Sequence, residues 1–318
     1  MTARGRAELA RPGRCVVMGV LNVTPDSFSD GGRHDTVDAA VAHGLGMVAA
    51  GADYVDVGGE STRPGADRVA AEEELHRVLP VVTELARTGV AVSVDTTRSQ
   101  VAAAALAAGA VLVNDVSGGL ADPAMAAVVA DAGVPWVLMH RRGDSRDMDA
   151  RAGYRDVVAD VRHALCRRVD AALAAGVDAG RVVVDPGLGF AKRPEHDLAL
   201  LAGLEAVTGL GLPVLVGASR KRFLGAVLTA ADGRTRTPLE RDSATLATTV
   251  LAASAGAWGV RVHDVAGSAD AVRVLAAVAA AAPQSELTPY RDLAHERRPG
   301  EPRVPRTSTD DTERWRSA

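Results

Sequence analysis

The chain has 318 residues, and its 47% hydrophobic content is enough to build a full folded core. A net charge of −4 excludes an overall basic field for nucleic acid or membrane, so any anion site must be local. The N-terminus lacks the apolar segment of a secretory signal, and no apolar run has membrane-spanning length. Cys15 and Cys166 have no paired spacing, so we expect two buried free thiols. We therefore expect a folded cytoplasmic protein.

The first predicted strand, Cys15–Val20, leads into a loop too polar for a plain turn. Residues 22–32 read Asn-Val-Thr-Pro-Asp-Ser-Phe-Ser-Asp-Gly-Gly. Their two carboxylates and one amide could hold a hard cation through oxygen. Because enzymes often keep their sites on long polar loops after strands, this loop predicts a functional site.

Short β-branched runs then recur along the chain and alternate with helical patterns. The predicted strands are Cys15–Val20, Asp53–Val57, Val90–Val94, Val111–Val113, Pro135–Met139, Arg181–Val184, Pro213–Val216 and Trp258–Val262. The predicted helices include Val37–Ala50, Ala71–Arg87, Arg98–Ala108, Pro123–Ala132, Tyr154–Ala175 and Ser243–Ala255. Apolar strands alternating with helices imply a parallel sheet covered on both faces. Eight units favour a single (β/α)8 TIM barrel, an α/β fold, over an open doubly wound sheet.

The predicted domain organisation has three parts. Residues 1–14 form an N-terminal extension, and residues 15–282 form the barrel. Residues 283–318 mix prolines with Arg, Asp, Ser and Thr and lack periodic apolar positions. We expect them to form a mobile tail outside the catalytic unit.

Polar residues follow every predicted strand. In a barrel the C-terminal ends of all strands open on one face, so these residues should converge. They are Asn22 with its loop, Gly58–Gly65, Ser93–Thr97, Asn114–Gly119, Met139–His140, Asp185–Phe190, Gly217–Lys221 and Arg261–Asp264.

Taken singly, some of these residues have a purely structural interpretation. Asp95 precedes a helix and could serve as its cap. That role fails for Asp185, which precedes a proline and two glycines, and for the cations Lys221 and Arg261. His140 and His263 lack the spacing of a zinc site. No Gly-x-Ser-x-Gly motif supports a serine nucleophile.

The joint pattern suits a flat heterocycle that carries a phosphorylated arm. Two carboxylates, an amide and an ammonium can match donors and acceptors along the ring edges; these are Asp95, Asp185, Asn114 and Lys221. A second group suits the arm together with Mg2+, namely Arg261, His263, Thr62 and Asn22. The ligand expected from these residues is a purine- or pterin-like diphosphate.

Seven motifs in order resemble the dihydropteroate synthase family over residues 15 to 280. They are Asn22–Gly32, Gly58–Gly65, Ser93–Thr96, Asn114–Gly118, Asp185–Phe190, Gly217–Lys221 and Arg261–Val265. The resemblance implies condensation of 6-hydroxymethyl-7,8-dihydropterin diphosphate with 4-aminobenzoate to give 7,8-dihydropteroate and diphosphate. The preference for arginine over lysine, with only Lys192 and Lys221 present, resembles actinobacterial members.

The resemblance also implies roles for individual residues. The pterin would be held by Asp95, Asn114, Asp185, Lys221 and Arg261. The diphosphate would be held by Asn22, Thr62, Arg261 and His263. The aminobenzoate pocket would comprise Phe28, Arg63, Phe190, Ser219 and Lys221. The catalytic residues would be Asp95, Lys221, Asp30 and Arg63. Mg2+ would be the cofactor, with Asn22 as a ligand, and the chain would be a homodimer and a sulfonamide target.

Two other functions remain open at this point. Segment 141–153 matches the family poorly, which leaves a non-catalytic pterin-binding paralogue possible. A corrinoid-linked methyltransferase shares the barrel and pterin pocket, but it has no use for the loop at Thr24–Ser29 or for a diphosphate clamp. In every case we expect a small-molecule ligand, with no nucleic acid or membrane as partner.

Overall fold

The computed structural model describes residues 8–24, 33–60, 68–143 and 151–282. Residues Met1–Ala280 form one compact unit, and Ala281–Ala318 form a second. The predicted tail at 283–318 lies outside the described residues, as do most of the polar loop after the first strand and the segment 61–67. The fold described below is that of the first unit.

Eight parallel strands form the sheet at the centre of this unit. They are β1 (Val16–Asn22), β2 (Tyr54–Gly58), β3 (Val92–Asp95), β4 (Leu112–Asp115), β5 (Trp136–Met139), β6 (Val182–Asp185), β7 (Leu215–Val216) and β8 (Gly259–Val262). Their order is β6-β5-β4-β3-β2-β1-β8-β7, and a parallel bridge between Val184 and Val214 brings the two edges together. The prediction of a single (β/α)8 barrel is confirmed.

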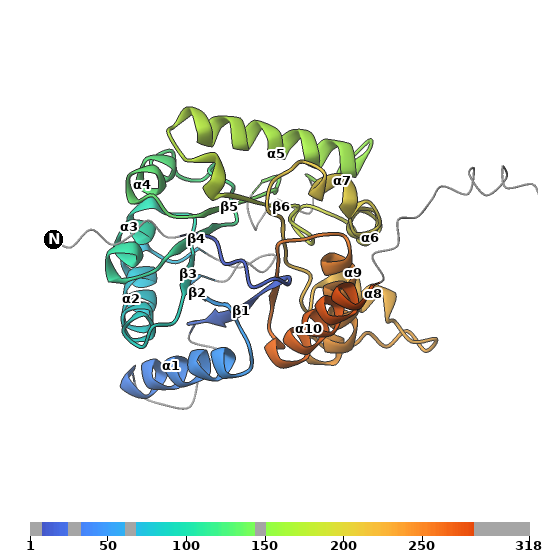
Figure 1. The fold of residues 1–318 in the computed structure, drawn as a ribbon, viewed down its shortest axis with the longest axis horizontal. Coiled ribbons are helices and arrows are strands. Elements are labelled where there is room, and N and C mark those ends of the chain that lie inside the picture. Colours follow the sequence, from blue (N-terminus) through green and yellow to red (C-terminus); the bar gives the residue numbers. More distant parts are fainter. Residues whose placement is uncertain (1–7, 25–32, 61–67, 144–150, 283–318) are drawn as a thin grey trace, which may run out of the picture. The chain divides into compact units, whose positions relative to one another are not determined.

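Helices surround the strands on the outside (Figure 1). The predicted helices are present as α1 (Arg33–Ala49), α2 (Ala71–Arg87), α3 (Ser99–Ala108), α4 (Met125–Ala132), α5 (Val157–Ala174) and α9 (Asp242–Ser254). Four further helices complete the outer layer: α6 (Pro194–Ala202), α7 (Leu204–Thr208), α8 (Arg222–Val227) and α10 (Val265–Ala281). The helices named from the sequence did not include these four.

Side chains alternate between the inside and the outside of the barrel with the period of two expected for strands. Outward positions such as Val55 and Val57 join a large apolar cluster with the helices. Inward positions form a smaller cluster near the start of the strands, containing Val16, Met18, Tyr54, Leu112, Val137, Val183 and Leu215. Further along the strands, the inward positions become polar. The same alternation that fills the barrel therefore places the polar residues at its C-terminal end.

The described part of the N-terminal extension packs against the opposite end of the barrel. Leu9 and Ala10 contact the smaller apolar cluster, and the backbone of Ala10 bonds to Tyr54 Oη at 2.9 Å and Trp258 Nε1 at 3.0 Å. Arg14 forms an ion pair with Asp53 at 2.7 Å. These contacts close the N-terminal end and leave the other end for ligands.

Both cysteines are free, but the prediction that both are buried was wrong. Cys15 is half-buried at the base of β1, and burial raises the pKa of its thiol to about 12. Cys166 is exposed on α5, because it lies away from the buried positions Leu165 and Val169 of that helix. Among the described residues, no helix is long and apolar enough to span a membrane.

Candidate active site

A buried polar layer lies at the C-terminal end of the barrel, above its apolar interior. Its members occupy inward positions of five strands: Asp56 on β2, Ser93 and Asp95 on β3, Asn114 on β4, Asp185 on β6 and Arg261 on β8. All except Arg261 are buried. The strand register sets Asp56 beside Ser93, and Asp95 beside both Gly58 and Asn114. Residues distant in sequence thus meet because their strands are neighbours.

Asp56 is the centre of this layer, and sequence reasoning missed it. Its side chain is 0% exposed and accepts hydrogen bonds from Ser93 Oγ at 2.5 Å, Asn114 Nδ2 at 2.8 Å and Arg261 Nε at 2.5 Å. A carboxylate is suited to this position because all three neighbours donate. The signal was present in the sequence, since Tyr54-Val-Asp-Val-Gly58 alternates and puts an acid on the inward face of an otherwise apolar strand.

Asp95 and Arg261, both predicted pterin-binding residues, contact each other directly. Arg261 Nη2 donates to Asp95 Oδ2 at 2.7 Å. Burial raises the pKa of Asp95, and the neighbouring Arg261 guanidinium opposes that rise. Asp95 does not cap the following helix, because the cap of α3 is Arg98 and the backbone N–H of Ser99 bonds Asp122 instead. The capping interpretation of Asp95 was therefore wrong, and its carboxylate belongs to the polar layer.

Asp185 and Lys221 lie on the other side of the layer. A Cβ added to Gly217 would lie 3.8 Å from both Asp185 Oδ2 and Lys221 Nζ, so both charged groups border this glycine. Asp185 Oδ1 accepts from the Gly187 N–H at 2.6 Å. Lys221 Nζ donates to the Leu188 carbonyl and lies 4.8 Å from the centre of the Phe190 ring. Three predicted site residues, Asp185, Lys221 and Phe190, are thus brought together.

The protonation of Lys221 gives a testable pH dependence. Burial lowers the pKa of Lys221 to about 8, and Asp185 and Asp197 oppose that shift. If the ammonium form is required, kcat/KM should fall above about pH 8, where the free enzyme loses this proton. The residual activity of a Lys221→Met variant should lack this alkaline limb.

Deprotonation of Lys221 does not destabilise the fold, so it cannot lower kcat/KM at high pH by unfolding the protein. The pKa of Lys221 in the folded state lies below the ordinary value of 10.5. Between the two values the unfolded chain binds more protons, so the contribution of Lys221 to the free energy of unfolding increases with pH. Melting temperatures measured across the same pH range provide the control. An alkaline limb that persists unchanged in Lys221→Met would contradict the assignment.

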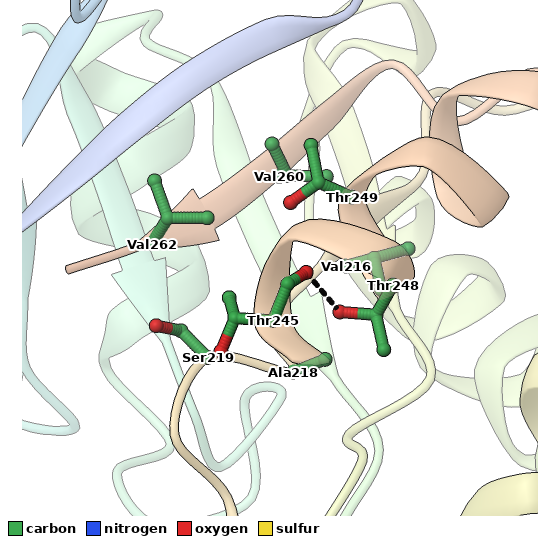
Figure 2. A pocket seen from close by; sticks show the side chains of 8 residues that line it. All are labelled: Val216, Ala218, Ser219, Thr245, Thr248, Thr249, Val260 and Val262. Atoms are coloured by element: carbon green, nitrogen blue, oxygen red, sulfur yellow. Dashed lines mark hydrogen bonds between the residues drawn. The ribbon is translucent and has the colours of Figure 1, made fainter. Parts of the chain in front are cut away.

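Ser219 and His263 also meet, although the resemblance assigned them to different substrates. Ser219 Oγ lies 2.9 Å from His263 Nδ1 and accepts from the His263 backbone N–H at 3.1 Å. Ser219 borders a hollow beneath α9, where Thr245, Thr248 and Thr249 face β7 and β8 (Figure 2). That hollow has no room for a water molecule. It therefore serves packing.

The segment after β2 is anchored by an ion-pair network. Arg98 Nη1 contacts Glu60 Oε2 at 2.7 Å and also bonds the buried Glu74. Glu74 accepts from Thr96 Oγ1 at 2.6 Å, and Arg77 Nη1 donates to the Gly59 carbonyl at 2.9 Å. Residues of α2, together with Thr96 and Arg98 after β3, therefore fix Gly59 and Glu60, which precede Thr62 and Arg63 in the sequence.

The remaining predicted site residues fall into two groups. Asn22 ends β1, is half-buried and pairs in register with Gly58. Phe28, Asp30, Thr62 and Arg63 lie outside the described residues, so their predicted roles stay predictions.

The two described ends of segment 141–153 border a large cleft beside α5. The cleft measures about 610 Å3 and is lined by Leu120, His140, Arg141, Arg142, Gly143, Arg151, Asp160, His163, Ala164, Arg167 and Arg168. Arg142 pairs with Asp160 at 3.2 Å and lies 4.0 Å above the Tyr154 ring. Arg168 donates to the carbonyls of Met139 and Arg141. These contacts give the arginines a structural role at the end of β5.

Fold and site together define a (β/α)8 barrel of the enzyme class, with a polar candidate site at its strand ends. Comparison with known proteins agrees with this class. The family model described as pterin binding enzyme matches residues 18–263. A dihydropteroate synthase of Mycobacterium leprae is 60% identical over 271 residues, which cover 85% of this chain and 95% of that protein.

Solved structures give the same result. A Xanthomonas albilineans dihydropteroate synthase with 4-aminobenzoic acid is 49% identical with a TM-score of 0.77, covering 84% of this chain and 94% of that one. A Yersinia pestis dihydropteroate synthase with a sulfonamide drug complex is 40% identical with a TM-score of 0.79, covering 88% and 99%. The chain therefore belongs to the pterin binding enzyme family, and its relatives place it among the dihydropteroate synthases. The mycobacterial relative also fits the predicted actinobacterial type.

Proposed function

We propose that this chain condenses 6-hydroxymethyl-7,8-dihydropterin diphosphate with 4-aminobenzoate, releasing diphosphate and forming 7,8-dihydropteroate. The observation that carries the proposal is the buried layer in which Asp56 links Asn114 and Arg261, while Arg261 contacts Asp95. A layer of oriented donors and acceptors at the end of a barrel suits recognition of a flat heterocycle. The likeness to dihydropteroate synthases, one of them solved with 4-aminobenzoic acid, supports both substrates.

The polar layer would bind the pterin ring through hydrogen bonds. Because one N–H of Asn114 Nδ2 donates to Asp56, the amide has a fixed orientation, and its oxygen can accept from the ring. Asp185 carries one oxygen bonded to Gly187 N and can use the other toward N–H groups of the pterin. Arg261 is fixed by Asp56 and Asp95 through Nε and Nη2, so its plane is preset against the ring.

The reaction breaks the bond between the pterin methylene and a diphosphate oxygen, and it forms a carbon–nitrogen bond to the aryl amine. Electron release from the dihydropterin ring can support positive charge on the departing methylene, and the Asp95 carboxylate favours that charge. Lys221 and Arg261 place positive charge beside the pterin pocket, where it would stabilise the negative charge of the leaving diphosphate. An aryl amine is neutral at pH 7, so no strong general base is required. Substitution can therefore be dissociative.

The aminobenzoate pocket is proposed to include Phe190, Ser219 and Lys221, together with Phe28 and Arg63. Phe190 supplies an apolar face beside the Lys221 ammonium, an arrangement that suits an aromatic carboxylate. Sulfonamides would bind the same pocket, as the Yersinia pestis complex with such a drug suggests. Asp30 and Arg63 complete the proposed catalytic set.

Mg2+ is the proposed cofactor, with Asn22 as a ligand. Asn22 offers an amide oxygen at the end of β1, and Mg2+ prefers oxygen ligands supplied by a few side chains, water and substrate phosphates. When bound, the ion would neutralise charge on the leaving diphosphate. Thr62, Arg261 and His263 would contact the same diphosphate. Calorimetric titration of diphosphate with and without Mg2+ tests this, and binding that is indifferent to Mg2+ would oppose it.

A direct assay decides between the proposed activity and the two other functions. Purified protein given the pterin diphosphate should release diphosphate in proportion to added 4-aminobenzoate, and it should restore folate synthesis to a strain lacking the synthase. A paralogue without catalysis would bind pterin but release nothing. A methyltransferase would require a corrinoid methyl donor or acceptor and would leave 4-aminobenzoate unconsumed.

Substitutions of Asp185 and Asp95 should affect different kinetic parameters. Asp185→Asn removes an ionised acceptor of the ring in ground and transition states alike, so the KM for pterin diphosphate should increase by about 30- to 150-fold, or 2–3 kcal/mol. Asp95→Asn removes the charge that favours the transition state, so kcat should fall more than KM changes. Steady-state kinetics of both variants measures the split. Identical effects of the two substitutions on both parameters would refute this division.

A homodimer is proposed from exposed apolar side chains on neighbouring helices. Leu198 on α6, Val227 on α8 and Leu251 on α9 are exposed, and α6 contacts both other helices. Leu239, in the short turn Leu239–Arg241 that contacts α9, is exposed as well. Contiguous apolar surface commonly marks an interface. Sedimentation analysis should give twice the chain mass, and Leu251→Arg should shift it toward the monomer. A wild-type monomer at micromolar concentration would exclude the dimer.

The proposed location is the cytoplasm. Both cysteines are free, which fits a reducing compartment, and the proposed substrates are small metabolites. Cell fractionation with antibody detection would test the location.

A further inference from the structure

Lys192 is buried beside the candidate site, and none of the roles proposed above uses it. It is one of only two lysines in the chain, and its side chain is only 5% exposed. It follows Phe190 by two residues in the loop between β6 and α6. A buried lysine has a high desolvation cost, so its retention calls for specific contacts.

Three acceptors surround the Lys192 ammonium. Nζ donates to the Gly187 carbonyl at 2.7 Å and the Phe190 carbonyl at 3.0 Å, and it lies 3.0 Å from His140 Nδ1. Burial, followed by the nearby Lys192 charge, lowers the pKa of His140 to about 2, so the imidazole is neutral and Nδ1 can accept. Three donors thus meet three acceptors, two of them in the loop that holds Phe190.

The loop needs such a clamp because its backbone is tightly bent. Gly187, Gly189 and Ala191 all have positive φ, at 68°, 75° and 51°. A Cβ at Gly187 would lie 1.9 Å from the His140 carbonyl oxygen, so the loop passes directly over the end of β5. Positive φ is costly for alanine, so Ala191 keeps this conformation only while surrounding contacts hold it. The Tyr154 hydroxyl also bonds the Ala191 carbonyl, at 3.0 Å.

The loop held by Lys192 packs against one side of the Lys221 side chain. The Leu188 carbonyl accepts from Lys221 Nζ, and the Phe190 ring lies 4.8 Å from the same nitrogen. A Cβ at Gly189 would lie 3.0 Å from Lys221 Cδ, so the loop backbone packs directly on the lysine stem. A shift of the loop would therefore move Phe190 and one partner of Lys221 together. It would not directly disturb the bonds of Asp56, Asp95 and Asn114.

We infer that Lys192 is a positioning residue for the aminobenzoate pocket: it clamps the loop of residues 186–191 so that Phe190 and the Leu188 carbonyl stay against Lys221. The inference rests on the proposed function, because that function assigns Phe190 and Lys221 to the aminobenzoate. Burial lowers the pKa of Lys192, in agreement with its enclosed position. The bonds among Asp56, Asp95, Asn114 and Arg261 do not involve this loop. Asp185 contacts it only through the Gly187 N–H, so we expect the larger effect on 4-aminobenzoate and a smaller one on the pterin.

Lys192→Met tests the inference, because methionine fills most of the volume but donates no hydrogen bond. The KM for 4-aminobenzoate should increase by about tenfold or more, while the KM for pterin diphosphate increases by a clearly smaller factor, through the bond of Gly187 to Asp185. In a Phe190→Ala background the further effect of Lys192→Met on aminobenzoate should be smaller than in the wild type, because one of the two groups that Lys192 positions is already absent. Equal changes in both KM values, or effects that multiply independently, would overturn the inference.

Arg168→Met is the matched control. Arg168 is also a buried cation that donates to two backbone carbonyls, those of Met139 and Arg141, but neither lies in the loop of residues 186–191. It should lower the melting temperature without separating the two KM values. If Lys192→Met fails to fold, His140→Leu removes one acceptor of the clamp and should raise the aminobenzoate KM by a smaller factor. An unchanged KM there would oppose the inference.

Failure of the proposed function is distinguishable from failure of this inference. Wild-type protein that forms no product would defeat the function. Calorimetry of 4-aminobenzoate in the presence of pterin and Mg-diphosphate would then compare wild type with Lys192→Met without turnover. Weaker aminobenzoate binding by the variant would still support the clamp, and equal affinity would overturn it.

Discussion

Lys221→Arg should lose about 99% of the condensation activity, because a misplaced group in a preorganised site commonly costs on the order of 100-fold. The lysine fits a narrow space: Nζ bonds the Leu188 carbonyl, the Phe190 ring lies 4.8 Å away, and the Gly189 backbone packs on the stem. A planar guanidinium is larger than an ammonium and cannot take the same place without moving Phe190. The variant would keep the positive charge at this position but lose the placement of the ammonium.

The measurement is kcat/KM for both substrates, together with the melting temperature. Arg220→Lys is the matched control, because it makes the reverse exchange one residue earlier in the same loop. Arg220 pairs with Asp242 at 2.7 Å and 2.8 Å, away from the polar layer. The control should retain most activity. Turnover close to wild type in Lys221→Arg would show that Lys221 does not contact the substrates as proposed.

The architecture was predictable from the chain because parallel strands buried on both faces leave a strong pattern. The runs around Val92–Asp95 and Val182–Asp185 are short, apolar and followed by polar residues, and each became a strand ending in the site. Strand order follows chain order around the barrel, with β8 beside β1 and the Val184–Val214 bridge joining the two edges of the sheet. Consecutive units in a barrel are neighbours, so convergence of the strand ends followed from the fold class alone.

The site was only partly predictable, for a physical reason. Sequence reasoning attends to polar residues after a strand, whereas Asp56 lies within one, two residues before its end. Its importance comes from Ser93, Asn114 and Arg261 on three other strands, and strand register alone reveals those contacts. Lys192 was noted as a rare lysine, but its acceptors come from the chain reversal at Gly187 and from His140 on β5. Backbone carbonyls have no sequence signature.

Asp56→Ala should have the largest effect on stability. It removes the acceptor shared by Asn114 and Arg261, which leaves the buried Asn114 amide without it and leaves Arg261 paired with Asp95. Breaking a buried ion pair by removing one partner costs about 3–5 kcal/mol in the free energy of unfolding, and we expect the lower end of this range because Arg261 keeps Asp95. Pterin binding should also weaken by about 100-fold, because Asn114 and Arg261 lose the group that orients them. The stability and pterin affinity of Asp56→Asn should lie between those of Asp56→Ala and the wild type, since an amide oxygen still accepts but the charge is lost.

Asp53→Ala provides the comparison, because Asp53 immediately precedes the same strand at its opposite end. Asp53 pairs with Arg14 at 2.7 Å and accepts from the Val17 N–H at 2.8 Å, far from the polar layer along β2. Its loss should lower the free energy of unfolding but leave pterin affinity unchanged. Urea denaturation and calorimetry with a pterin measure the two quantities separately. If Asp56→Ala binds pterin as tightly as Asp53→Ala does, then Asp56 only stabilises the barrel, and the orientation of Asn114 and Arg261 must come from other contacts.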